Sequence, residues 1–191
     1  RDFYESIFWG ISWPNQPAGS MYLFGAIAKA DELMFNGLTF LNQEIRAFPS
    51  FIMPFLEKKL SFILVKIPFV LAEIGLGWLV YRMVLKLTAD KKKALLGGGL
   101  IWFNPALIYN SAVWGQTDPL INLLALMGVW LIWNKKYLWG LLAFIGSLYF
   151  KLSLIIWLPI FGLILLRNKE WLKIFLAFIL SSSFYFLISL P

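Results

Sequence analysis

The sequence predicts an all-α, polytopic membrane helical bundle, and two observations lead to that prediction. First, 60% of the 191 residues are hydrophobic, 14% are charged and the mean hydropathy is +0.75, whereas soluble domains are closer to half apolar and a quarter charged. Second, the net charge of +7 comes from short basic clusters between apolar runs. That arrangement is typical of membrane topology signals and excludes nucleic acid as the expected partner.

Residues 1–60 differ from the rest of the chain. They are rich in aromatic and apolar residues, but prolines and scattered charges interrupt every apolar run before it reaches the roughly 20 residues of a spanning helix. We therefore expect an outer-face loop here, with short amphipathic helices lying on the membrane surface. We also expect a fragment of a longer protein, because the sequence opens at Arg1 without an initiator methionine and stops at Pro191.

Residues 61–191 are predicted to form a transmembrane bundle of about six spans. The expected spans are residues 61–85, 95–113, 120–133, the two arms of 137–166, and 171–190. Three basic loops, after residues 85, 133 and 166, should lie in the cytoplasm by the positive-inside rule. Residues 1–60 and the loop 114–118 then face the periplasm, the cell exterior or the lumen.

The apolar block 137–166 allows two arrangements. A single helix would be about 45 Å long, against a hydrocarbon core of about 30 Å, and would place Lys151 in mid-membrane. A hairpin with arms of about 21 Å each brings Lys151 to the outer side, level with Asp118. We prefer the hairpin, because an ionisable residue inside a membrane is costly.

The residue types available limit the chemistry. The chain has neither cysteine nor histidine, which excludes thiolate or imidazole metal sites, a cysteine nucleophile and a histidine base. The cofactor stays open, with an oxygen-liganded divalent metal as one option. After residue 60 only four acids occur, and Asp90 and Glu170 stand beside lysines in basic loops. Asp118 and Glu73 are therefore the carboxylates to consider.

Asp118 has two interpretations. Because Pro119 follows it, Asp118 fits the N-cap of a helix over residues 120–133. Capping does not account for its polar neighbours, however. Trp114 offers a sugar an apolar ring face, although it also fits a membrane-interface anchor. Gly115 allows close backbone approach, and Gln116 adds an amide for hydrogen bonds to a carbohydrate.

Two lysines within apolar segments also have two interpretations each. Lys66 lies on the same helical face as Glu73, which predicts an ion pair within the bundle; alternatively it points into a polar cavity and binds phosphate. Lys151, at the hairpin tip, either extends to the lipid headgroups or faces inward and binds a lipid-linked phosphate.

Several motifs, in this order, together resemble GT-C glycosyltransferases, nearest the GPI mannosyltransferase 2-like group and its prokaryotic relatives. The motifs are Asn104-Pro105 with Asn110 and residues 114–118 (the family's NP … WGQ-x-D segment), Lys66-Ile67-Pro68 with Glu73, Phe150-Lys151 with Pro159, and, in the first outer loop, Phe3-Tyr4-Glu5-Ser6 with residues 13–19. The resemblance covers residues 3–160.

The resemblance implies an activity and a location. The donor would be a polyprenyl-phosphate sugar, mannose or another hexose, and the acceptor a glycan or lipid. Transfer would take place at the outer face of a prokaryotic cell membrane, or at the ER membrane in a eukaryote. A carboxylate would deprotonate the acceptor hydroxyl, which attacks C1 in one inverting step.

The resemblance also implies roles for individual residues. Asp118 would be a catalytic residue that orients the nucleophile, and Lys151 and Lys66 would stabilise the departing phosphate. Sugar or acceptor would be held by the side chains of Trp114, Gln116 and Asn110.

The chain departs from the family at the first outer loop. Ser12 stands where the family tends to have aspartate, and the family's catalytic aspartate falls upstream of the Phe3-Tyr4 pair, outside the sequence. Asp2 is the only nearby acid that could substitute for it. Two rival functions stay open: a transporter or flippase in which the buried charges line a path, and a non-catalytic membrane subunit.

Overall fold

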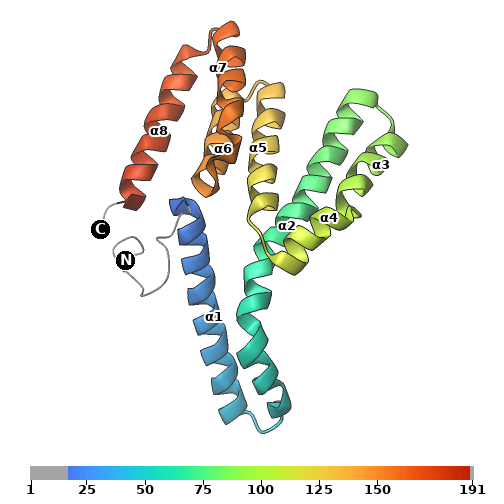
Figure 1. The fold of residues 1–191 in the computed structure, drawn as a ribbon, viewed down its shortest axis with the longest axis vertical. Coiled ribbons are helices and arrows are strands. Elements are labelled where there is room, and N and C mark those ends of the chain that lie inside the picture. The colour runs from blue at the N-terminus through green and yellow to red at the C-terminus, as the bar shows by residue number, and fades with distance from the viewer. Residues whose placement is uncertain (1–16, 190–191) are drawn as a thin grey trace.

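The computed structural model describes residues 17–189, and the regular structure in that range is entirely helical, as predicted (Figure 1). The helices are α1 (Ala18–Glu44), α2 (Met53–Thr88), α3 (Lys91–Trp102), α4 (Pro105–Ile108), α5 (Asp118–Trp133), α6 (Tyr137–Phe150), α7 (Leu158–Arg167) and α8 (Trp171–Ser189). A π-helical segment, Tyr109–Trp114, follows α4, and short 3-10 segments, Ser50–Ile52 and Leu152–Trp157, precede α2 and α7.

Helices α1 and α2 form an N-terminal hairpin (Figure 1). In place of the short surface helices expected before residue 60, α1 is one continuous helix of 27 residues, about 40 Å long. Helix α2 has 36 residues. It includes both the end of the expected outer-face loop and the whole predicted span 61–85. Ser61 Oγ on α2 donates a hydrogen bond to Asp31 Oδ2 on α1 at 2.5 Å.

The expected span over residues 95–113 is not a single helix. Helix α3 ends at Trp102, and the chain restarts as α4 with Asn104 as its N-cap, whose Oδ1 accepts from the Ala106 N–H at 2.9 Å. The break lies at Pro105, which has no N–H to donate and clashes with the preceding turn. The chain then widens into the π-helical segment before the loop that precedes α5.

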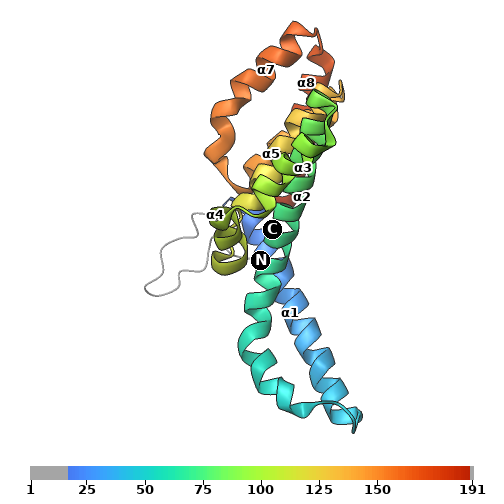
Figure 2. The same cartoon turned by 90° about the vertical axis from the view of Figure 1, so that its right-hand side faces the viewer.

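The block 137–166 breaks at Lys151, as the hairpin arrangement predicts. Helix α6 ends at Phe150, Lys151 is extended (φ −163°, ψ 129°), and the chain turns back through a 3-10 segment into α7 (Figure 2). The two arms touch where the rings of Phe144 and Phe161 stack with their centroids 4.0 Å apart.

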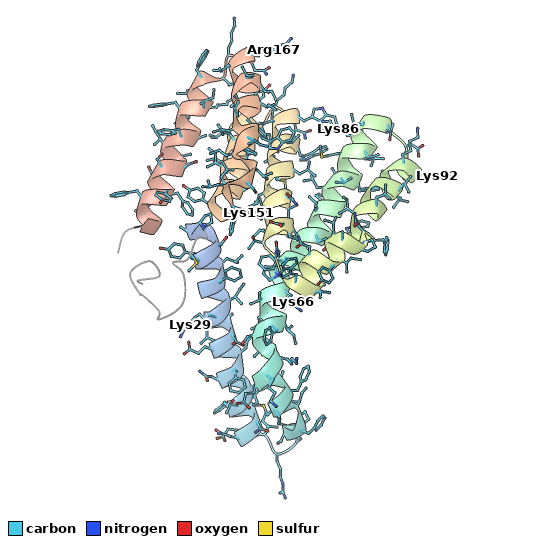
Figure 3. The ribbon with its side chains drawn as sticks, viewed as in Figure 1. Lys29, Lys66, Lys86, Lys92, Lys151 and Arg167 are labelled. Atoms are coloured by element: carbon cyan, nitrogen blue, oxygen red, sulfur yellow. The ribbon has the colours of Figure 1, made fainter. Side chains whose placement is uncertain are left out.

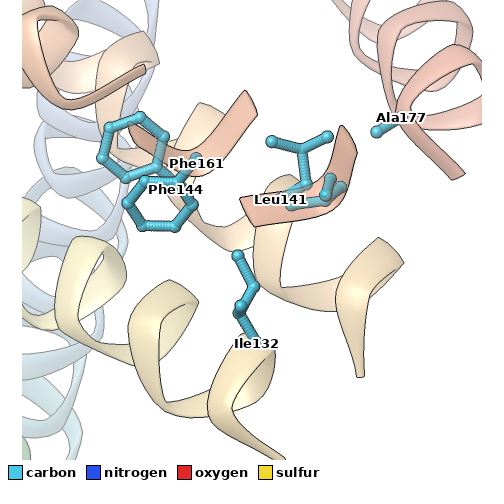
Figure 4. Close-up of a cluster of buried hydrophobic side chains, with 6 residues drawn as sticks. Ile132, Leu141, Phe144, Phe161 and Ala177 are labelled. Atoms are coloured by element: carbon cyan, nitrogen blue, oxygen red, sulfur yellow. The ribbon is translucent and has the colours of Figure 1, made fainter. Parts of the chain in front are cut away.

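A hydrophobic cluster joins the last four helices (Figure 4). Its buried members come from α5, α6, α7 and α8: Ile132, Leu141, Phe144, Phe161, Leu165 and Ala177. Helices α5 and α6 also approach closely at two glycines, since a Cβ on Gly128 would lie 2.8 Å from the carbonyl oxygen of Gly140. In this tight antiparallel pair, the start of α5 lies beside the end of α6.

The basic loops gather at one end of the helices. Lys86, Lys92 and Arg167 lie at that end, whereas Lys151 lies at the opposite end of α6 (Figure 3). Lys86 Nζ donates to Asn134 Oδ1 at 2.5 Å and so ties the C-terminal ends of α2 and α5 together. Lys29 and Lys66 also lie away from the end with Lys86, Lys92 and Arg167 (Figure 3), so the three basic loops share one end although basic residues occur elsewhere too.

By helix length and composition, the structure supports fewer membrane spans than the predicted six. Among residues 17–189, one helical segment, Ser50–Thr88, is long and apolar enough to cross a membrane, with a mean hydropathy of 2.0 over its most apolar part. Four further apolar helical segments are shorter: Asp118–Trp133, Tyr137–Phe150, Leu152–Arg167 and Trp171–Leu187.

Candidate functional site

The centre of the candidate site is an ion pair between two residues far apart in sequence. Lys151 Nζ lies 2.7 Å from Asp118 Oδ1, and the two side chains are 42% and 32% exposed. Asp118 is the first residue of α5, and Lys151 directly follows the last residue of α6. Because α5 and α6 are antiparallel neighbours, the start of one helix and the end of the other meet at the same end of the pair (Figure 1).

The helix ends favour these two charges. A carboxylate is stabilised at the positive N-terminal end of a helix, and an ammonium group at the negative C-terminal end. Asp118 and Lys151 occupy those positions on α5 and α6. The pair is thus supported by both helix dipoles as well as by its own 2.7 Å contact.

Two predicted roles need correction here. Asp118 is not the N-cap of α5: Thr117 holds that position without a side-chain capping bond, and Asp118 Oδ1 accepts from Lys151 instead. Lys151 does not extend away from the protein, since its ammonium group reaches back to α5. The predicted meeting of these two groups is confirmed.

The loop before α5 is shaped by one glycine. Gly115 has φ +75°, a left-handed conformation that most side chains disfavour. The Gln116 N–H then donates to the Asn110 carbonyl oxygen at 3.0 Å, which closes the π-helical turn. Asn110 and Gln116 are both half-buried.

Trp114 presents an open ring beside this loop. Its side chain is 67% exposed, and it contacts Tyr109 edge to face with the ring centroids 6.4 Å apart. An exposed indole fits both predicted interpretations, a platform for a sugar ring and an anchor at a membrane interface.

Lys66 of α2 lies against the loop at Gly115. A Cβ placed on Gly115 would be 3.5 Å from Lys66 Cγ, so the aliphatic part of this lysine packs against the loop. Lys66 also lines a cavity of about 310 Å³ on α2, together with Phe55, Lys59, Phe62 and Ile63. All of these residues come from α2, so the space is an open groove along one helix, lined by two cations and two aromatic rings.

The predicted ion pair between Lys66 and Glu73 is wrong. Glu73 is buried and accepts a hydrogen bond from Ser111 Oγ. The two residues share a face of α2 but lie two turns apart, about 10 Å along the axis, and the loop occupies the space around Lys66. The residue types on α2 could not reveal the partner of Glu73, because Ser111 comes from the π-helical segment.

The start of α1 completes the surroundings of Lys151. Ser20 is fully buried, and its Oγ donates to the Phe150 carbonyl oxygen at 2.7 Å. A Cβ on Gly19 would lie 2.7 Å from the Tyr149 carbonyl oxygen, so only glycine fits this contact. Sequence reasoning missed Ser20; the run of small residues after Pro17 was the available signal.

Two further predictions concern acids at the site. Asp2, the expected substitute for an upstream catalytic acid, lies outside the described residues. Within residues 17–189, no group of three or more acidic side chains comes together in a way that could hold a metal ion.

Comparison of the chain with known proteins gives no match: no family model, no curated protein and no solved structure is similar to it.

Proposed function

We propose that this protein is a multi-pass membrane glycosyltransferase that transfers a hexose from a polyprenyl-phosphate donor to a glycan or lipid acceptor at the outer membrane face. The observation that carries the proposal is the Asp118–Lys151 ion pair beside the loop with Trp114 and Gln116. A cation for a phosphate, a carboxylate for a hydroxyl and an aromatic ring for a sugar are the groups that this reaction needs.

The multi-pass arrangement is supported by the apolar helices and the charge pattern. The segment Ser50–Thr88 is long enough to span, and α2, α7 and α8 carry many exposed large apolar side chains, which a membrane would cover. At 16 and 14 residues, α5 and α6 are about 24 and 21 Å long. Short spans are accommodated where the bilayer thins or where other helices replace lipid.

The proposed reaction is a single displacement at C1 of the hexose. The acceptor hydroxyl oxygen attacks C1 of the hexose while a carboxylate takes its proton, and the bond from C1 to the phosphate oxygen breaks. Among the described residues, Asp118 is the carboxylate at this place, and through a hydrogen bond from the acceptor hydroxyl it would both orient the nucleophile and take its proton. The phosphate leaves with additional negative charge, which Lys151 stabilises as a point charge.

The ion pair has a further consequence in this scheme. Before the donor binds, Asp118 holds Lys151 in position at 2.7 Å. A donor phosphate that contacts Lys151 competes with Asp118 and releases its carboxylate toward the acceptor. Donor binding thereby frees the group that orients the nucleophile, which couples the two substrates.

Lys66 adds a second cation to the donor side. Its cavity combines Lys59 and Lys66 with the rings of Phe55 and Phe62. Such a surface suits a molecule with an anionic head and an apolar chain, because the lysines attract the phosphate and the rings cover hydrocarbon.

Sugar transfer by variants of the purified protein tests the proposal. With undecaprenyl-phosphate mannose and glucose as donors, Asp118→Ala and Lys151→Ala should each lower transfer at least about tenfold. Glu170→Ala and Lys173→Ala are matched controls, since these residues form an ion pair at 2.8 Å in a predicted cytoplasmic loop. Unchanged transfer by well-expressed Asp118 and Lys151 variants would overturn the proposal, and substrate uptake by proteoliposomes without transfer would favour the transporter.

A further inference from the structure

A second cavity of about 310 Å³ lies between α2, the end of α3 and the π-helical segment. Its walls are Val70, Glu73, Ile74, Trp102, Phe103, Ile108, Ser111 and Ala112. No residue of the Asp118–Lys151 site lines it. The walls are apolar except for Glu73 and Ser111. The carboxyl group of Glu73 is therefore the only charged group of the described residues that a ligand in this cavity could meet.

Glu73 is incompletely satisfied in this cavity. Its side chain is 5% exposed, and its Oε2 accepts from Ser111 Oγ, whereas its Oε1 has no hydrogen-bond partner among the described residues. The ion pairs of that part of the chain involve other acids, namely Glu32, Asp118 and Glu170. A buried polar oxygen without a partner costs about 1–3 kcal/mol, which a ligand that donates a hydrogen bond would recover.

The aromatic walls restrict the ligand further. The Trp102 indole N–H already donates to the Ile74 carbonyl oxygen at 2.9 Å, so this ring has only its faces and carbon edge to offer. Phe103, which also lines the cavity, is 79% exposed. Aromatic faces beside a carboxyl group are the combination that attracts an organic cation. A π-helical segment, which places Ser111 here, is itself frequent at functional sites.

We propose that this cavity binds a small amphiphilic amine, with the ammonium group donating to Glu73 Oε1 and the apolar body packed against Trp102 and Phe103. Charge complementarity favours an ammonium group over a neutral donor, because no cation of the described residues pairs with Glu73. The volume is at the lower end of ligand pockets, about 300–1,000 Å³, so the amine is small. This binding is independent of the proposed sugar transfer.

Titration calorimetry on the purified protein in detergent tests this inference, with hexylammonium as the probe and hexanol as its neutral match. The wild-type protein should bind hexylammonium at least tenfold more tightly than hexanol. Glu73→Gln keeps the size and the oxygen facing Ser111 but should abolish this preference. Glu57→Gln, the same change at an exposed position of α2, should preserve it. Equal binding of the two probes by the wild type, or a preference that survives in Glu73→Gln, would overturn the inference.

A second variant covers the case in which Glu73→Gln does not fold. Ala112→Phe adds a ring at the cavity wall without changing the carboxyl group, and should reduce hexylammonium binding at least tenfold. Undiminished binding by Ala112→Phe would show that the amine binds elsewhere and would refute the site. Because the readout is binding, its failure is distinguishable from a failure of sugar transfer.

Discussion

The contact between α5 and α6 positions Asp118 opposite Lys151, and a single methyl group at Gly140 tests how tightly that contact is packed. A Cβ on Gly140 would lie 2.6 Å from Ile132 Cγ1, 2.8 Å from the Gly128 carbonyl oxygen and 3.0 Å from the Ile132 nitrogen. Two of these three atoms belong to the backbone of α5. They cannot rotate away, so Gly140→Ala must push the two helices apart.

Two opposing effects set the change in the free energy of unfolding that Gly140→Ala causes. Alanine is favoured over glycine in a helix by about 0.8–1.0 kcal/mol, and overpacking a close contact costs about 1–3 kcal/mol. Gly146, also in α6, has nothing within 4 Å of an added Cβ. Gly146→Ala therefore has the favourable helix propensity of alanine without the cost of overpacking. The free energy of unfolding of the two variants should therefore differ by about 1–3 kcal/mol, with Gly146→Ala the more stable.

Titration of the purified protein from mild detergent into SDS, followed by far-ultraviolet circular dichroism, measures this difference. The wild type should fall between the two variants or close to Gly140→Ala. A Gly140→Ala protein as stable as Gly146→Ala would refute the close approach of α5 and α6, and with it the packing argument for the Asp118–Lys151 pair.

Three further outcomes are expected. Gly19→Ala should lower the free energy of unfolding by about 1–3 kcal/mol in the same titration, because its methyl group meets the α6 backbone; an unchanged midpoint would contradict this contact. Lys86→Met should cost about 1 kcal/mol, since it removes the bond to Asn134 and a cation over two tryptophan rings. A double-mutant cycle with Asp118→Asn and Lys151→Gln should give a coupling of about 0.5–1 kcal/mol that falls in high salt, and a coupling of zero would exclude the pair in solution.

The helical class and the turn at Lys151 could be predicted from the sequence because both depend on local properties. A chain with so many apolar and so few charged residues must pair its backbone groups within helices if lipid surrounds it. A charge in the middle of block 137–166 is costly inside a membrane, and the chain turns there. The loop with Gly115 and Gln116 was predictable for the same reason, since polar residues and glycine interrupt an apolar run.

The partners of the buried residues could not be predicted in this way. Lys66 was the nearest cation to Glu73 on one helix face, yet Ser111 is its partner because the π-helical segment packs against α2. Ser20 meets the Phe150 carbonyl oxygen across 130 residues of sequence. The continuous α1 was also missed, since scattered charges break an apolar run without breaking a helix.

By itself, the amino-acid sequence determined that this protein is helical, where its charges interrupt apolar segments and which residue types are available for chemistry. The sequence also placed Lys151 level with Asp118, but only the tertiary structure decided that Ser111, and not Lys66, is the partner of Glu73, and that Glu73 lies beside an apolar cavity. The physical reason is that helix formation and the cost of burying a charge depend on residues close together in the sequence, whereas the contact between Glu73 and Ser111 joins two segments 38 residues apart.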